Sequence, residues 1–154
     1  MKVNNTREID DKFIWKDAAG LVTTFLGSAA GSRRIYVNID SVPPGAFSTK
    51  YHSHSQQEEF FLILSGSGVL RLNGEEYSVG KGDFISKPAG KNIAHQFYNS
   101  GNETLKILDV GTAEKEDIVY YPDEEVYLAK SGSERRVYGK DGEKQGWTSD
   151  PNVK

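Results

Sequence analysis

Hydrophobic residues recur at every second position in short runs along this chain, and clusters of glycine, proline, asparagine and serine separate the runs. A period of two is typical of β-strands that bury one face, and no long segment shows the 3.6-residue period of an amphipathic helix. The pattern predicts strands over residues 34–40, 46–54, 59–65, 68–73, 75–79, 83–87, 95–99 and 104–110.

The connections between these runs favour antiparallel pairing. Asn73-Gly74 separates two alternating runs, as expected for a two-residue hairpin turn of the primed kind. Pro43-Pro44-Gly45 and Pro88-Ala89-Gly90 are further turn signals. Short strands joined in this way predict an all-β fold, an antiparallel sandwich or barrel.

The two ends of the chain differ from the middle. Apolar stretches at 13–15 and 21–26 are interpreted as edge strands or as an arm that docks on a neighbouring copy. The C-terminal part is polar and glycine-rich, and we expect a loosely held tail anchored by Tyr138 and Trp147. The predicted organisation is an N-terminal arm (1–33), a β-barrel (34–128) and a polar tail (129–154).

The composition of the chain argues against several classes of function. The net charge of −3, from 19 Lys and Arg against 22 Asp and Glu, argues against a nucleic-acid-binding surface. The lack of cysteine excludes disulfides, thiolate metal sites and cysteine nucleophiles. The N-terminal residues lack the apolar segment of a signal peptide, and the longest apolar run, 60–64, is too short to cross a bilayer. We therefore expect a cytoplasmic protein without nucleic-acid or membrane partners.

The histidines are the main candidates for chemistry, and the chain has three: His52, His54 and His95. Side chains at i and i+2 leave a strand on the same face, so His52 and His54 point the same way. If Glu59, which starts the next run, faces the same interior, a carboxylate joins two imidazoles. Folding the run that begins at His95 beside them brings three histidines and one glutamate together. Such ligands suit a divalent transition metal: iron, manganese, nickel, cobalt, copper or zinc.

Side chains on the same strand faces define a predicted pocket beside this metal. Glu59 shares its face with Phe61 and Ile63, and His95 shares its face with Phe97. We predict that these three apolar residues line the substrate pocket. The candidates for polar contact with a substrate are Tyr36, Ser48, Lys50 and Gln96.

The spacing of these residues resembles the two sequence motifs of the cupin superfamily. The first motif is matched, with one extra residue after its first glycine, by Gly45, His52, His54, Glu59 and Gly66. The second motif is matched, with two extra residues before its histidine, by Gly82, Pro88, Gly90, His95 and Asn99. The resemblance covers about residues 45–110.

The resemblance implies a double-stranded β-helix, the small cupin jelly-roll barrel, with a metal near its mouth. On this match the ligands would be His52, His54, Glu59 and His95. Glu58 competes with Glu59 for the carboxylate role, but only Glu59 keeps six residues before Gly66. A bulge at Lys91 or Asn92 would keep His95 in register. If His95 were displaced, the other three ligands would remain as a facial triad.

By resemblance, the reactions expected at such a site are dioxygenation, decarboxylation and isomerisation of a small molecule, with Glu59 as a ligand or as a base. One alternative is a non-catalytic metal-binding or small-molecule-binding module or sensor. A second alternative is a metal-independent sugar isomerase or epimerase. Because exposed sheet edges favour association, we also expect a homodimer.

Overall fold

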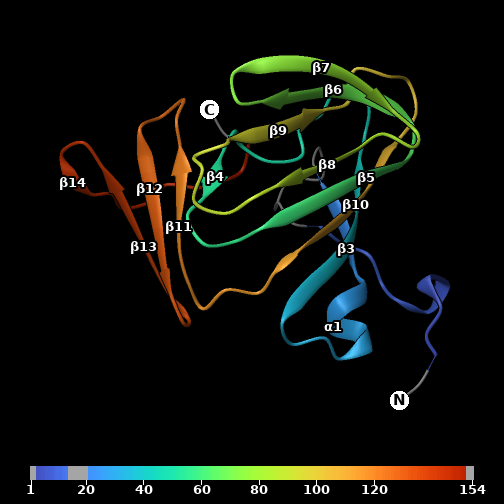
Figure 1. Ribbon diagram of the computed structural model, residues 1–154, viewed down its shortest axis with the longest axis horizontal. Coiled ribbons are helices and arrows are strands. Elements are labelled where there is room, and N and C mark those ends of the chain that lie inside the picture. Colours follow the sequence, from blue (N-terminus) through green and yellow to red (C-terminus); the bar gives the residue numbers. More distant parts are fainter. Residues whose placement is uncertain (1–2, 14–20, 152–154) are drawn as a thin grey trace.

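Short antiparallel strands make up most of the structure, a computed structural model that describes residues 3–13 and 21–151 (Figure 1). Helical structure is confined in these residues to the 3₁₀ turn η1 (Thr6–Glu8) and the short helix α1 (Leu26–Ala30). The strands are β1 (Lys12–Phe13), β2 (Val22–Phe25), β3 (Ile35–Val42), β4 (Ser53–His54), β5 (Glu59–Ser65), β6 (Ser67–Leu72), β7 (Glu75–Gly80), β8 (Phe84–Lys87), β9 (His95–Tyr98), β10 (Leu105–Thr112), β11 (Glu116–Tyr121), β12 (Val126–Ser131), β13 (Glu134–Gly139) and β14 (Gly142–Glu143). Neither helix is long and apolar enough to span a membrane.

The strands form three antiparallel sheets, which confirms the predicted all-β jelly-roll fold. Their orders are β1-β2-β3-β10-β5-β8, β7-β6-β9 and β14-β13-β12-β11-β4. The first two sheets share a core in which Phe61 and Ile63 of β5 pack with Leu70 of β6 and Phe97 of β9. Burial alternates along β5, with Phe60 on the outer face, as the period of two predicts.

Seven of the eight predicted strands are present within one or two residues of their expected ends. The predicted hairpin joins β6 to β7, and the positive φ angles of Asn73 (51°) and Gly74 (86°) fit a type I′ turn.

The eighth predicted strand, residues 46–54, is regular only in β4. Before β4 the segment follows β9 through isolated bridges, one of which pairs His52 with His95. Two backbone carbonyls of this segment accept hydrogen bonds from side chains. Gln96 Nε2 donates to Thr49 O, and His52 Nδ1 donates to Lys50 O. A continuous ladder is therefore interrupted at the position where the first histidine turns inward.

The N-terminal apolar stretches contribute edge strands, as expected. β2 pairs with β3 of the same chain, and β1 pairs with β2. Of the predicted stretch 13–15, Ile14 and Trp15 lie outside the described residues. Within the stretch 21–26, β2 thus extends the chain's own six-stranded sheet.

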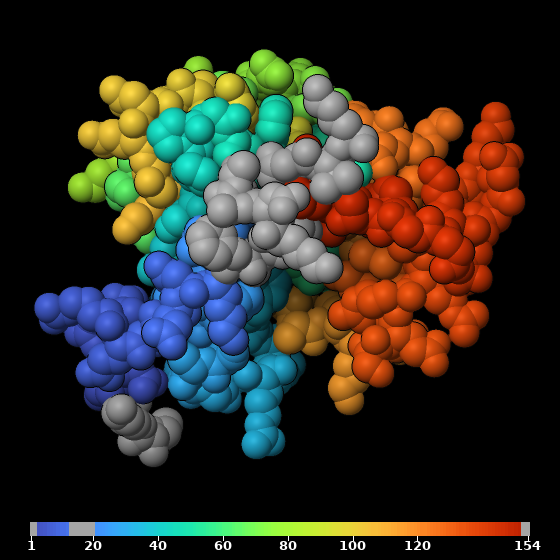
Figure 2. All heavy atoms as spheres, turned by 180° about the vertical axis from the view of Figure 1, so that it is seen from behind, coloured from blue at the N-terminus to red at the C-terminus, as the bar shows by residue number. Residues whose placement is uncertain are grey.

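The expectation of a loosely held C-terminal tail is wrong. β12 runs through residue 129, and β13 and β14 extend the same sheet, which forms one side of the molecule (Figures 1 and 2). A second small core of Val119, Tyr121 and Val126 holds it in place. As predicted, Trp147 is an anchor: its ring centroid lies 4.6 Å from that of Tyr121.

Candidate metal centre and its cavity

His52, His54 and Glu59 converge inside the barrel. They come from the segment before β4, from β4 itself and from the first position of β5. Each side chain offers one ligand atom, and these atoms lie within 4.8 Å of one another. All three are buried, at 8%, 7% and 4% exposure. Two imidazole nitrogens and a carboxylate oxygen fit a divalent transition metal.

Both histidines of this cluster are oriented by hydrogen-bond acceptors. Nδ1 of His52 donates to the carbonyl of Lys50 at 2.7 Å, and Nδ1 of His54 donates to Oδ2 of Asp117 at 2.6 Å. The proton therefore lies on Nδ1, and Nε2 keeps the lone pair that a metal needs. Nε2 of His54 is 3.5 Å from Glu59 Oε1. Burial, helped by the charges of His54 and Lys87, lowers the pKa of His52 to about 3, so this ring is neutral.

Glu59 is an ionised carboxylate held by three neighbours. Its Oε1 accepts hydrogen bonds from Gln57 Nε2 at 3.0 Å and from the Tyr36 hydroxyl at 3.1 Å. Its Oε2 is buried and forms an ion pair with Lys87, whose Nζ lies 2.5 Å away. Burial raises the pKa of Glu59, but attraction to His95, Lys87 and His54 in their protonated forms outweighs this effect and holds it well below its usual range. Such a carboxylate with a free lone pair is a good cation ligand.

His95 lies beside this cluster but differs from the other two histidines. It is buried, and its ring centroid is 4.7 Å from that of His52. Its Nδ1 faces Lys87 Nζ at 2.7 Å and lies 3.8 Å from Glu59 Oε2. Among the described residues, the group with ligand atoms within 4.8 Å of one another does not include His95. The structure thus brings three of the four predicted ligands together.

The choice of Glu59 over Glu58 is consistent with the structure. Glu58 is exposed, whereas Glu59 faces the interior. The two extra residues before His95 are accommodated in a turn where Asn92 has a φ of 54°. His95 remains buried and bridged to His52, so the insertion is absorbed before the strand.

Sequence reasoning missed Lys87 and Asp117. Lys87 is only 2% exposed and is the register partner of Glu59 across β5 and β8. Asp117 accepts hydrogen bonds from His54 and from the backbone of Ser55 and Gln56. The register that pairs residue 59 with residue 87 brings Lys87 to the site, and this register cannot be read from the sequence.

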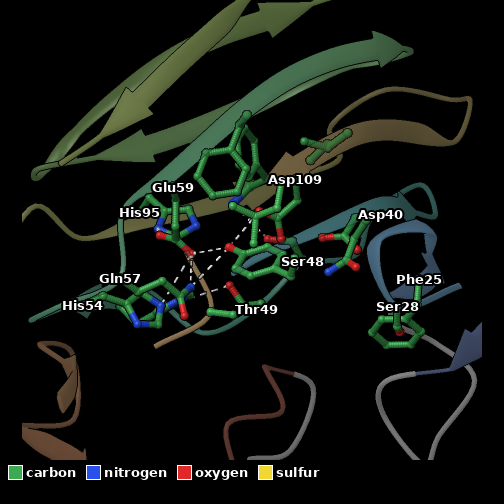
Figure 3. A pocket seen from close by; sticks show the side chains of 18 of the residues that line it. Phe25, Ser28, Asp40, Ser48, Thr49, His54, Gln57, Glu59, His95 and Asp109 are labelled. Carbon is green, nitrogen blue, oxygen red and sulfur yellow. Dashed lines mark hydrogen bonds and ion pairs between the residues drawn. The ribbon is translucent and has the colours of Figure 1, made fainter. Parts of the chain in front are cut away.

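The cluster opens into a cavity of about 490 Å³, seen from close by in Figure 3. Phe61 and Phe97 line it, as the pocket prediction requires, but Ile63 does not. Ile63 instead borders a small apolar void with Leu70 on the other side of Phe61. A role of any of these residues in substrate binding stays a prediction.

Two of the four polar candidates, Tyr36 and Ser48, also line the cavity. Lys50 instead forms an ion pair with Glu124, 2.6 Å between Nζ and Oε1. Gln96 is bound to the backbone of the segment before β4.

The cavity continues from Glu59 past two carboxyl groups, Asp40 of β3 and Asp109 of β10, toward Phe25 and Ser28 (Figure 3). The Tyr36 hydroxyl bridges Asp109 and Glu59, at 3.0 Å from Oδ1 of Asp109. Burial raises the pKa of Asp40 to about 6. Burial and the charges of Asp40 and Glu59 raise the pKa of Asp109 well above its usual value. These groups therefore hold protons more readily than ordinary aspartates.

Residues 38–111 match the family model described as the cupin domain, and this range contains the whole cluster. The chain belongs to the cupin superfamily. An uncharacterized protein of Methanocaldococcus jannaschii is 38% identical over 69 residues, which are 45% of this chain, and the match spans about half (54%) of that relative. The auxin-binding protein T92 of Nicotiana tabacum is 33% identical, with 71% of this cupin and 72% of that protein covered.

Among solved structures, a cupin-superfamily sugar phosphate isomerase from Silicibacter pomeroyi resembles this cupin over nearly the whole chain. The TM-score is 0.84 at 29% identity, and the match covers 92% of this chain and 94% of that one. The similarity therefore includes the C-terminal strands that extend beyond the range of the family model.

Proposed function

We propose that this cupin is a metal-dependent isomerase of a sugar-derived, polyhydroxylated small molecule. The observation that carries the proposal is that the cluster opens into a cavity rich in hydrogen-bonding groups. A polyhydroxylated substrate needs many donors and acceptors, because each buried hydroxyl must find a partner. The cavity offers Tyr36, Asn38, Asp40, Ser48, Thr49, Gln57 and Asp109. The likeness to a sugar phosphate isomerase supports this choice over dioxygenation and decarboxylation.

Isomerisation of a hydroxy-carbonyl compound moves a proton between neighbouring carbons. A divalent ion held by His52, His54 and Glu59 would polarise the carbonyl oxygen. The proton carrier needs a pKa near the working pH. Asp109 suits this role better than Glu59. Burial raises the pKa of Asp109, whereas neighbouring positive groups hold the pKa of Glu59 low. The Tyr36 hydroxyl, bound to both carboxylates, keeps Asp109 next to the site.

The test is proton NMR of sugar phosphates incubated in D₂O with the protein loaded with Mn²⁺, Co²⁺ or Zn²⁺. We expect interconversion of an aldose and a ketose, with deuterium entering at the carbon next to the carbonyl. Asp109→Asn should abolish turnover while keeping the metal, and His54→Ala should lose both.

Two results would contradict the proposal. Stoichiometric metal with no turnover of any compound in the panel would favour a non-catalytic binding module. Undiminished turnover in the presence of a strong chelator would favour the metal-independent isomerase.

We also propose that the protein is a cytoplasmic homodimer. Phe60 and Phe84 stack on the outer face of the six-stranded sheet with ring centroids 6.0 Å apart, and Phe84 is 68% exposed. Exposed aromatic rings beside an edge strand favour association. Sedimentation velocity at micromolar concentration distinguishes a dimer from a monomer.

A further inference from the structure

The backbone of Lys50 orients one of the candidate metal ligands. Its carbonyl oxygen lies 2.7 Å from Nδ1 of His52, closer than the Thr49 hydroxyl at 3.4 Å. His54 is oriented by a side chain of the regular strand β11, whereas the acceptor for His52 belongs to the irregular segment before β4. The direction of the His52 ring therefore depends on how firmly Lys50 is held in place.

The side chain of Lys50 is held by two residues from the C-terminal part of the chain. Its Nζ lies 2.6 Å from Oε1 of Glu124 and 5.1 Å from the ring centroid of Trp147. The circuit is closed by Trp147, whose Nε1 donates to Oε2 of Glu124 at 2.5 Å. Each of these three residues contacts the other two, and the Lys50 side chain is only 16% exposed. We call Lys50, Glu124 and Trp147 the C-terminal clamp.

A second contact path joins Trp147 to His52 through Tyr121. The ring centroid of Tyr121 lies 4.6 Å from that of Trp147 and 5.6 Å from that of His52. Tyr121 is buried, so its ring cannot shift without disturbing its neighbours. In Figure 1 the red chain after β14 returns from the outer edge of the five-stranded sheet toward the barrel. Trp147 therefore supports His52 at its ring face and, through Lys50, at its Nδ1.

We propose that the C-terminal clamp positions His52 for metal binding, so that the chain after β14 is a working part of the metal centre. Its three members are positioning residues, because they act through His52. A ligand ring that is already held in its binding orientation loses less conformational freedom when the metal binds. This inference rests on the metal site of the proposed function and goes beyond it, since it requires no particular reaction.

The experiment measures Zn²⁺ affinity by competition with a chromophoric chelator. We expect Trp147→Ala to bind Zn²⁺ about 10-fold more weakly, the lower end of the usual cost of losing a supporting contact. Trp147→Phe keeps a ring against Tyr121 but lacks the donor to Glu124, so its loss should be smaller. Tyr138→Ala is the matched control, since Tyr138 is a partly exposed aromatic residue of the same sheet as Tyr121. Its affinity should equal that of the wild type, and an equal loss there would overturn the inference.

A change of background shows whether the effect passes through His52. Added to His52→Ala, which keeps a weaker site at His54 and Glu59, Trp147→Ala should cause no further loss of affinity. Added to Asp117→Asn, which acts through His54, it should still cost about 10-fold, because independent effects add. A full further loss in the His52→Ala background would mean that Trp147 stabilises the fold in general, and the inference would be wrong.

Lys50→Met tests the clamp without touching an aromatic ring. It removes the contacts to Glu124 and Trp147 but keeps the backbone carbonyl that orients His52, and we expect weaker Zn²⁺ binding. If Trp147→Ala does not fold by circular dichroism, Lys50→Met and its combination with His52→Ala decide the question. Wild-type affinity in Lys50→Met and in folded Trp147→Ala would overturn the inference.

The outcomes also separate this inference from the proposed function. Failure of the wild type to bind stoichiometric Zn²⁺ would overturn both. Zn²⁺ binding with the expected losses in the clamp variants, but without turnover of any sugar phosphate, would overturn the proposed function alone and support the inference.

Discussion

Asp117 determines how His54 faces the candidate metal centre. Its Oδ2 accepts the Nδ1 proton of His54, while its Oδ1 accepts backbone N–H groups of Ser55 and Gln56, both at 3.0 Å. Burial raises the pKa of Asp117, but hydrogen bonds from His54 and Gln56 outweigh it, so the pKa lies well below its usual range. The carboxylate therefore stays charged and would strengthen His54 as a metal ligand.

We predict that Asp117→Asn weakens divalent metal binding by about 10–100-fold, the usual cost of losing a partner that supports a histidine ligand. The amide keeps an acceptor for the backbone but can turn its NH₂ group toward His54. Competition with a chromophoric chelator measures the affinity. Asp123→Asn is the control, because Asp123 is exposed and pairs with Arg71 away from the cluster. Equal affinity of the two variants would mean that other contacts orient His54.

Single residues also show what the sequence could and could not predict. His52, His54 and Glu59 could be predicted because a period of two fixes their faces and their separation is short. Asp117 could not, because it meets His54 from 63 residues away, across the pairing of β4 with β11. Lys87 could not either, because a lysine in a short strand normally faces water and burial depends on its partner Glu59.

At the scale of elements, the turn from β5 to β6 shows why the first motif ends in glycine. Gly66 has a φ of 78°, and a Cβ there would lie 2.6 Å from the carbonyl oxygen of Thr104 and 2.9 Å from Cα of Leu105. Both atoms belong to the backbone and cannot turn away. The close approach of this turn to β10 keeps β5, and with it Glu59, next to its neighbour in the sheet.

Gly82→Ala provides a matched comparison for Gly66→Ala. Gly82 also has a positive φ, 96°, but a Cβ there would meet nothing within 4 Å. We predict that Gly82→Ala lowers the free energy of unfolding by about 1–2 kcal/mol, the cost of the left-handed conformation alone. Gly66→Ala should cost clearly more, because the clash adds to the strain. Urea denaturation measures both, and equal losses would contradict a tight approach at residue 66.

Strands could be predicted where apolar and polar residues alternate and turn-forming residues mark the ends, as in β5 to β7. The C-terminal hairpin of β12 and β13 was missed because burial is sparse there: Val126 is buried but most positions are half-buried or exposed. A hydrophobic pattern cannot distinguish such a sheet from a polar tail. Residues 46–54 were predicted as one strand, although only β4 is regular. The alternation of apolar and polar residues does not reveal the hydrogen bonds from side chains to the carbonyls of this segment.

At the scale of the whole molecule, the candidate metal cluster lies where the sheets meet. His54 belongs to the five-stranded sheet through β4, and Glu59 belongs to the six-stranded sheet through β5. His52 is bridged to His95 at the start of β9, in the three-stranded sheet. An ion held by these side chains would join separate sheets, so its binding energy would contribute to the stability of the whole fold.

We predict that divalent metal raises the melting temperature of this cupin by a concentration-dependent amount. A ligand that binds only the folded state at 100 times its Kd stabilises it by about 2.7 kcal/mol. For a domain of this size each kcal/mol raises Tm by about 2–4 °C, so the expected shift is roughly 5–11 °C. Differential scanning calorimetry with Zn²⁺, and again after chelation, measures the shift and its reversal. His52→Ala, which removes a ligand, should melt at the same temperature with and without metal, and a shift as large as that of the wild type would place the binding elsewhere.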